Sequence, residues 1–563
     1  QAGFIRGIER IGGFGGKADV LAACTVYEKN PGCFRDSLKA IAQATPAQVR
    51  AAGAKWLRNP SHVFVVKPGV RKELAEAPAG TPAPFALPAV DRRFKTTPST
   101  VDRSTGVPVT TSFPDLKFPT LQRATLKNGT TVILAERREI PVVQMSYQFA
   151  GGYSADPAGK PGTASFTMSL LDEGAGDLSA LAFADRAESL GANIGASASL
   201  DSSSAYLSAL RTNLEPSVKL FADMLRKPRF EQAEIDRVKS QWIAGIKQEK
   251  AQPAGIVQRV LPGLVFGETH PYGTPRTGSG TEAAIGALSR NDLLAFHAAS
   301  VRPQGATLVV VGDTTLGEIV PVLERHFGDW SASGNAGASV ALPAVAQQGK
   351  PRVFLIDQPG AVQANIFAAQ LAPSSKDPAA LAFDMANMVI GGDFTARLNM
   401  NLREEKHWSY GARSSAGNSV GPRLWSASAP VQIDKTAESV AEIQREIAEF
   451  SAGKRGTSAD ELARMQKIMT LSLPGAYETA ASVMGTIGSN VLYGRPDDYV
   501  FQRKAQIEAM TPAQVDAAAK AMDPNALTWV IVGDLTKTEK EVRALNLGEV
   551  TVLDADGKPV ARQ

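Results

Sequence analysis

The amino-acid sequence predicts an α+β protein made of tandem homologous domains, each a mainly antiparallel sheet packed against helices. Two observations lead to this prediction. A capped helix followed by a strand occurs three times, and pairs of strands precede stretches of helix in two places. The chain has 563 residues, and a prior of roughly one domain per 150 residues suggests three or four domains.

The repeated segment begins at Thr45, Ser289 and Thr511. Each of these residues is a good N-cap, and a Gln or Asp follows three residues later, where a capping box requires it. Two copies also place Pro at the first helical position. β-branched runs follow, at residues 63–66, 308–311 and 529–532, and these indicate short strands. The copies lie a domain's length apart, so we interpret each as the closing helix and strand of a domain.

Other elements fit the same class. Asn128 and Gly129 predict a hairpin turn between two strands. Apolar and polar side chains alternate over residues 142–153, which predicts a strand. A second domain start is predicted at residues 352–356, a strand that turns at Pro359 and Gly360. Residues 231–250 predict a long helix, with apolar side chains on one stripe: Ile235, Val238, Trp242, Ile243 and Ile246.

A change of composition divides the chain. Residues 71–115 predict an extended linker, because proline fixes φ and removes a hydrogen-bond donor; the prolines are Pro78, Pro82, Pro84, Pro88, Pro98, Pro108 and Pro114. Residues 1–70 carry the end of a domain without its beginning. Residues 116–338 and 339–563 are predicted to form two similar α+β domains.

Composition excludes some classes of function. The formal net charge is +4, with acidic and basic residues interspersed, which argues against a nucleic-acid partner. No apolar run approaches the roughly 18 residues of a membrane span. The chain starts at Gln1, which we interpret as a processing or truncation point. Cys24 and Cys33 are either two buried thiols or a local disulfide.

Residues 162–174 resemble the metal-binding helix of the pitrilysin, insulin-degrading enzyme and mitochondrial processing peptidase family of inverted-motif zinc metallopeptidases. Framework sequences are similar at residues 270–273, 327–330 and 11–21. The resemblance implies a pitrilysin-like metallopeptidase fold. It also implies that the chain is the non-catalytic C-terminal half, with residues 1–70 as the tail of the catalytic half.

The zinc motif of that family is degenerate here. Catalytic members carry two His as zinc ligands, a Glu between them as the base, and a further Glu downstream. The resemblance places Ser165 and Ser169 at the two His positions, Met168 at the Glu, and Gly245 near the downstream ligand. Methionine and hydroxyl groups cannot hold catalytic zinc. We therefore expect no metal or other cofactor in this chain, and zinc in the missing catalytic half.

Residues 391–398 and 402–411 are similar to a second stretch of the family, in which an Arg and a Tyr seven positions apart reach the substrate. The resemblance assigns these roles to Arg403 and Tyr410. A guanidinium and a phenol are suitable donors to the oxygen that becomes negative during peptide hydrolysis. The alternative is structural: Arg403 pairs with Glu404 or Glu405, and Tyr410 begins a strand.

Two adjacent glycines precede these residues. Gly391 and Gly392 are interpreted either as a glycine-rich substrate loop or as the C-terminal cap of a helix.

The resemblance implies a function: the non-catalytic, substrate-enclosing half of a zinc peptidase, inactive alone and partnered by a catalytic half and by peptide substrates. The alternatives are a separate non-catalytic subunit of a heterodimeric peptidase and a structural relative without a peptidase role. Residues 1–70 favour a piece of a single-chain enzyme, since an independent subunit is not expected to begin within a domain. The cysteine pair and the resemblance suggest a periplasmic or secreted protein.

Overall fold

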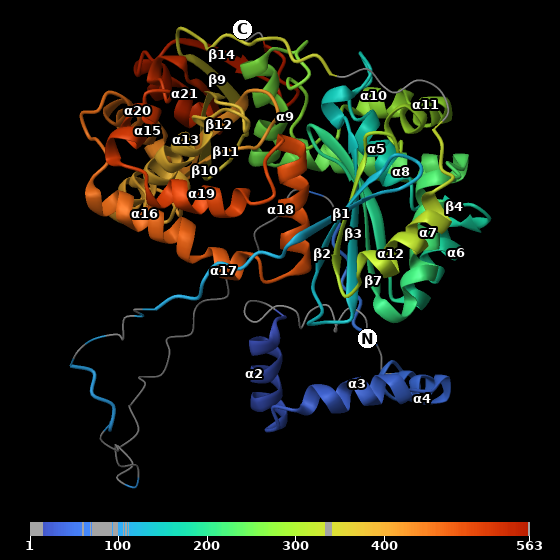
Figure 1. The fold of residues 1–563 in the computed structure, drawn as a ribbon. Coiled ribbons are helices and arrows are strands. Elements are labelled where there is room, and N and C mark those ends of the chain that lie inside the picture. The colour runs from blue at the N-terminus through green and yellow to red at the C-terminus, as the bar shows by residue number, and fades with distance from the viewer. Residues whose placement is uncertain are drawn as a thin grey trace. The chain divides into compact units, whose positions relative to one another are not determined.

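The structure is a computed structural model that describes residues 15–58, 61–67, 69, 93, 99–104, 106, 110, 112–332 and 340–560 (Figure 1). The chain divides into two compact units, one of residues 1–22 with 115–563 and one of residues 23–114. We call residues 115–332 the first lobe and residues 340–560 the second lobe. The predicted linker, residues 71–115, lies mostly outside the described residues, as does the start of the framework match at residues 11–21.

Three helices precede the linker: α2 (Lys17–Glu28), α3 (Cys33–Gln43) and α4 (Pro46–Trp56). The capping box predicted at Thr45 is present. Cys24 and Cys33 form a disulfide, which is one of the two predicted alternatives. The strand predicted at residues 63–66 is wrong. These residues form no strand and their side chains are exposed, because no strand in the described part of the chain pairs with them.

The first lobe contains a six-stranded sheet in the order β1-β2-β8-β3-β7-β6. Its strands are β1 (Leu121–Thr125), β2 (Thr131–Glu136), β3 (Val142–Ala150), β6 (Asn193–Ala198), β7 (Ser202–Leu210) and β8 (Thr307–Gly312). Strands β1 and β2 form the predicted hairpin, in which Gly129 has φ of +88°. That left-handed conformation suits glycine because it has no Cβ.

The helices of the first lobe are α5 (Thr163–Ser169), α6 (Ala180–Leu190), α7 (Leu214–Arg226), α8 (Gln232–Ala251), α9 (Pro253–Phe266), α10 (Glu282–Ala287), α11 (Arg290–Ser300) and α12 (Leu316–Phe327). A small hairpin joins β4 (Gly174–Ala175) and β5 (Leu178–Ser179). The stripe predicted on α8 is confirmed: Ile235, Val238 and Ile246 are buried in the core, and Trp242 and Ile243 pack against it.

The second sheet has the order β11-β12-β10-β13-β9-β14. Its strands are β9 (Arg352–Asp357), β10 (Gln363–Ala372), β11 (Arg413–Ala416), β12 (Arg423–Gln432), β13 (Thr528–Gly533) and β14 (Glu549–Leu553). From β9 to β11 the strands follow the same order and directions as from β2 to β6 in the first sheet. The capped helices α11 and α20 precede the equivalent strands β8 and β13, so the predicted α+β fold class is confirmed.

Helices of the second lobe are α13 (Ala380–Asn387), α14 (Arg397–Asn399), α15 (Thr436–Ser451), α16 (Ala459–Leu471), α17 (Leu473–Ala476), α18 (Ala480–Tyr493), α19 (Tyr499–Glu508), α20 (Pro512–Ala519) and α21 (Leu535–Ala544). Two short π-helical turns interrupt them, η3 (Met388–Gly392) and η4 (Met400–Glu405). A π-helical turn inserts a residue into the helical repeat and frequently marks a functional site.

The two lobes exchange helices (Figure 1). One face of the first sheet packs on its own helices, while the opposite face packs on α18 of the second lobe, through Val483 and Ile487. Conversely, α9 of the first lobe covers one face of the second sheet, through Val257 and Leu261. Alternate residues of a strand point to opposite faces, so each central strand contributes to two cores.

A buried polar contact also joins the lobes. The hydroxyl of Tyr272 donates to Oδ1 of Asp201 at 2.5 Å, and the main-chain N–H groups of Val420 and Gly421 donate to Asp201 and Tyr272. Burial, together with the hydrogen bond to Asp201, raises the pKa of the Tyr272 phenol. Side chains of the first lobe therefore bind main-chain N–H groups in a loop of the second lobe.

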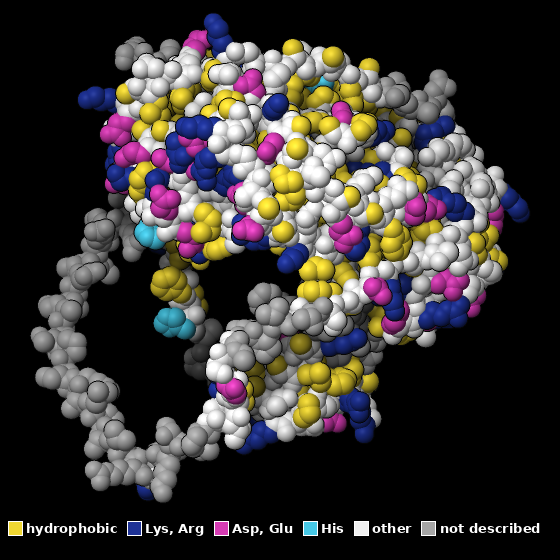
Figure 2. All heavy atoms as spheres, turned by 60° about the vertical axis from the view of Figure 1, so that its left-hand side comes forward, with side chains coloured by type: hydrophobic (Ala, Val, Ile, Leu, Met, Phe, Trp, Pro, Cys, Tyr) yellow, Lys and Arg dark blue, Asp and Glu magenta, His cyan; other side chains and the backbone are white. Residues whose placement is uncertain are grey.

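Basic and acidic side chains intermingle on the face drawn in Figure 2, as the sequence predicts. No helix in the described parts of the chain is both long enough and apolar enough to cross a membrane.

Candidate functional site

Helix α5 carries the degenerate zinc motif, and it is built into the core of the first lobe. Met168 is fully buried in the core cluster. Phe166, on the same helix, meets the ring of Trp242 from α8 edge to face, with 5.6 Å between ring centroids. The side chain that replaces the catalytic Glu is thus a core residue.

The remaining motif positions do not form a ligand set. Ser165 is 8% exposed, and its hydroxyl has no hydrogen-bond partner in the described structure. The hydroxyl of Ser169 donates to the main-chain oxygen of Phe166 at 2.8 Å. Gly245 is exposed on α8, and a side chain there would meet open space.

The carboxylate nearest in sequence to Gly245 is already used. Glu249 Oε2 accepts hydrogen bonds from Arg259 at 2.7 Å and from Ser279 at 2.9 Å. The Arg259 side chain is almost fully buried and also donates to the main-chain oxygen of Gly280. The Oε2 atom of Glu249 is thus already paired with a permanent cation. Among the described residues, no group of three His, Cys, Asp or Glu could hold a metal ion, and the donor set does not fit zinc.

The second candidate site is a surface cluster in the second lobe, made of Phe394, Arg403 and Tyr410. The Arg403 guanidinium lies over the Phe394 ring at 4.7 Å and over the Tyr410 ring at 4.9 Å. Both rings are largely exposed, Phe394 at 54% and Tyr410 at 83%. Arg403 belongs to the π-helical turn η4. The structure therefore brings Arg403 and Tyr410 together and adds an aromatic ring that the sequence analysis did not predict.

The buried side chain of Asn399 connects the two backbone segments that flank this cluster. Its Nδ2 donates to the main-chain oxygen of Phe394 at 2.7 Å, and its Oδ1 accepts from the N–H of Ala412 at 3.1 Å. A single buried amide therefore fixes the backbone that carries Phe394 relative to the segment that follows Tyr410.

Arg397 anchors the same region to the body of the lobe. Its guanidinium binds Glu461 through two hydrogen bonds of 2.8 Å and also donates to the main-chain oxygens of Arg455 and Gly456. Burial acts to raise the pKa of Glu461, but the hydrogen bonds from Arg397 and Ser458 outweigh it and lower the pKa to about 2. The ion pair between Arg397 and Glu461 thus fixes the backbone near the cluster to the body of the lobe.

Gly391 and Gly392 lie in the π-helical turn η3, and neither has positive φ. Gly391 is buried, and a Cβ there would lie 2.6 Å from the Ser414 hydroxyl and 2.7 Å from the Ser414 nitrogen. Its absence of a side chain lets this turn pack directly on β11. Gly392 is exposed. A left-handed helix cap is therefore not the role of either glycine.

Parts of the structural alternative for Arg403 are also present. Its Nε lies 3.1 Å from Oε1 of Glu404. Tyr410 lies outside the strands, in the connection that precedes β11. Within the described structure, Glu404 is the one acidic partner of Arg403, so the Nη groups remain available to a further acceptor. The cluster presents a guanidinium, a phenol and an apolar ring, which suit an extended peptide backbone.

Tandem lobes with exchanged helices, and a motif helix without a set of metal ligands among the described residues, are features of a pitrilysin-like protein. Residues 131–270 match the family model described as Insulinase (Peptidase family M16), and residues 287–469 match the one described as Peptidase M16 inactive domain. The chain belongs to peptidase family M16.

Individual relatives are distant. The chain is 23% identical over 407 residues to an uncharacterized zinc protease of Mycobacterium leprae, covering 70% of this chain and 88% of the relative. It is 21% identical to a non-peptidase homolog of Helicobacter pylori, covering 72% and 92%. A crystal structure of a peptidase M16 inactive domain from Pseudomonas fluorescens superposes with a TM-score of 0.68 at 26% identity, covering 74% and 98%.

Proposed function

We propose that this chain is the non-catalytic, substrate-enclosing half of a pitrilysin-type zinc peptidase that hydrolyses peptides, and that it is inactive alone. The match to an inactive M16 domain supports this, as does a motif helix that lacks zinc ligands. The catalytic half lies upstream in the same polypeptide or in a separate subunit. The proposed domains remain residues 1–70, 116–338 and 339–563, with the linker at 71–115.

The observation that carries the proposal is the exposed Arg403 and Tyr410 pair. Arg397 in this lobe is buried against its partners. Arg403 instead lies between two exposed rings. Cation–π contact holds the guanidinium in place without consuming its N–H donors. We assign these donors and the Tyr410 hydroxyl to the carbonyl oxygens of a bound peptide near the partner's zinc.

A separate partner subunit is the second arrangement. The coverage of 88% of the Mycobacterium leprae relative favours it, since that chain is little longer than the matched region. In either arrangement the roles of Arg403 and Tyr410 are the same.

The test uses the chain together with its catalytic half. Tyr410→Phe removes one donor and keeps the ring, so kcat should fall by roughly 10²–10³. Arg403→Ala should also raise KM, because the guanidinium contacts bound substrate. Tyr27→Phe is the matched control, since Tyr27 is 81% exposed, and it should leave kcat/KM unchanged.

Thermal unfolding separates a substrate role from a structural one. Both variants should keep the melting temperature of the parent chain, because the two side chains lie at the surface. An unchanged kcat/KM in both, with zinc bound to the catalytic half, would leave Arg403 as the surface partner of Glu404.

We further propose that the protein is periplasmic or secreted. The Cys24–Cys33 disulfide supports this, because such bonds persist in oxidising compartments. Mass mapping without reduction, on protein alkylated in its native compartment, should recover the two cysteines as one linked peptide. Two separately alkylated cysteines would count against export.

A further inference from the structure

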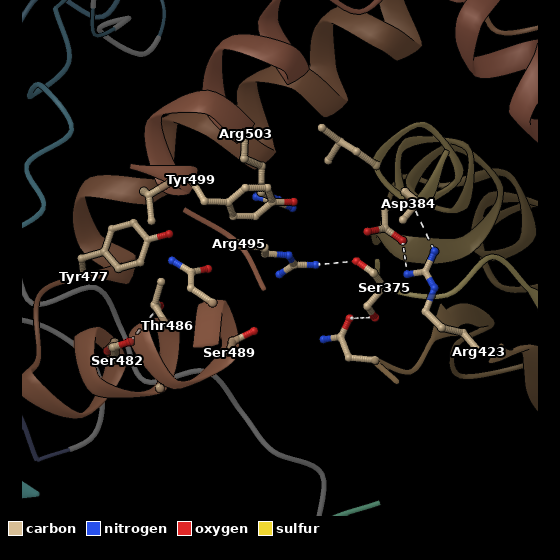
Figure 3. Close-up of a pocket in the computed structure, with 16 residues that line it drawn as sticks. Ser375, Asp384, Arg423, Tyr477, Ser482, Thr486, Ser489, Arg495, Tyr499 and Arg503 are labelled. Carbon is tan, nitrogen blue, oxygen red and sulfur yellow. Dashed lines mark hydrogen bonds and ion pairs between the residues drawn. The ribbon is translucent and has the colours of Figure 1, made fainter. Parts of the chain in front are cut away.

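A second concave site lies within the second lobe, between α13, α18 and α19. Its volume is about 380 Å³, which is within the range of small-molecule pockets. Figure 3 shows its walls, with Ser482, Thr486 and Ser489 on one helix and Tyr499 and Arg503 on another. It shares no residue with the Phe394, Arg403 and Tyr410 cluster.

The lining carries an excess of positive charge. Three arginines reach the pocket, Arg423, Arg495 and Arg503, against a single carboxylate, Asp384. Arg423 donates to Oδ1 of Asp384 at 2.6 Å and to the main-chain oxygen of Pro373, so this pair is mutually satisfied. The other two arginines have no carboxylate partner among the described residues.

Arg495 is held in position by neutral groups. Its Nη2 donates to the main-chain oxygen of Ser375 at 3.0 Å. Its guanidinium lies over the rings of Tyr493 and Tyr499, at 4.8 and 4.5 Å from their centroids. Arg503 follows Tyr499 by four residues on α19, which places both side chains on one face of the helix. Two half-buried cations therefore face the same pocket.

The pocket wall also contains a buried amide without an acceptor. Asn490 is 5% exposed and lines the pocket, and its Nδ2 has no hydrogen-bond partner in the described structure. An unsatisfied buried amide costs about 1–3 kcal/mol, so a native structure normally supplies it with an acceptor.

We propose that this pocket binds a small molecule through an oxyanion, either a phosphoryl group or a carboxylate. Such a group has acceptors only, and it would complement the donors of Arg495 and Arg503 that face the pocket. The volume exceeds that of the anion alone, and the rings of Tyr477 and Tyr499 lie beside it to contact the body of the ligand.

The test is calorimetric titration of the 563-residue chain at constant ionic strength with pyrophosphate, inorganic phosphate and citrate. At least one should bind with a stoichiometry of one, and Arg503→Gln should weaken it by about tenfold or more, the loss of one charge-assisted hydrogen bond. Arg495→Gln should act in the same direction. Arg186→Gln is the control, because Arg186 is exposed on α6 in the other lobe.

Binding of phosphate or pyrophosphate but not citrate would assign a phosphoryl ligand, and the reverse result a carboxylate. The proposal is overturned if none of the three anions binds at millimolar concentration. It is equally overturned if Arg503→Gln, with an unchanged melting temperature, binds as tightly as Arg186→Gln.

Discussion

At the scale of single residues, the positions that a zinc peptidase uses for chemistry have two different environments. Met168 is fully buried, and Gly245 is exposed with open space around it. The first position has become part of the core, where charge is costly. The second lies on a helix surface where many side chains are tolerated.

This contrast predicts opposite effects for two substitutions that restore the carboxylates. Met168→Glu should lower the free energy of unfolding by about 3 kcal/mol or more, because the carboxylate has no partner there. Gly245→Glu should raise it by roughly 0.5 kcal/mol, because glycine is a poor residue inside a helix. Urea unfolding measures both. A Met168→Glu variant as stable as the parent would show that this position is not a packed core site.

Arg403 and Tyr410 were predictable as a pair because a known sequence pattern carries both. Phe394 lies in the matched stretch 391–398, but its contact with Arg403 was not predictable, because the ring reaches Arg403 only through the backbone geometry around the turns η3 and η4.

At the scale of elements, α18 is the piece of the second lobe that closes the first. Ile487→Ala should lower the free energy of unfolding by about 2–5 kcal/mol, since Ile487 is buried against the sheet of the other lobe. Val491→Ala, on the same helix but 38% exposed, should change it by less than about 1 kcal/mol. Equal effects of the two variants would contradict the packing of α18 on the first sheet.

Local signals predicted elements well. The capping boxes at Thr45, Ser289 and Thr511 depend on residues three apart, and all three form. The exchange of α9 and α18 was not predictable, because an apolar helix face does not specify which sheet it covers. The strand predicted at residues 63–66 failed for the same reason, since strand propensity cannot supply a neighbouring strand.

At the scale of the whole molecule, the two sheets share the order and directions of their middle strands but differ at one edge. The first sheet ends in β1, antiparallel to β2, whereas the second ends in β14, parallel to β9. The predicted tandem arrangement came from the repeated helix and strand, which belong to the shared middle. Strand β1 lies at the start of the first lobe and β14 at the end of the second, so these edge strands belong to no repeated segment.

The helix exchange has a mechanical consequence. A hinge between the lobes would have to pull α18 from one sheet and α9 from the other, and it would also break the bonds of Asp201 and Tyr272 to the facing loop. Domain closures normally pivot on a few residues between separately packed bodies. Residues 115–332 and 340–560 show no such pivot, so we expect the two lobes to move together as one rigid body. Under the proposed function, admission of a peptide would then require both lobes to move together relative to the catalytic half.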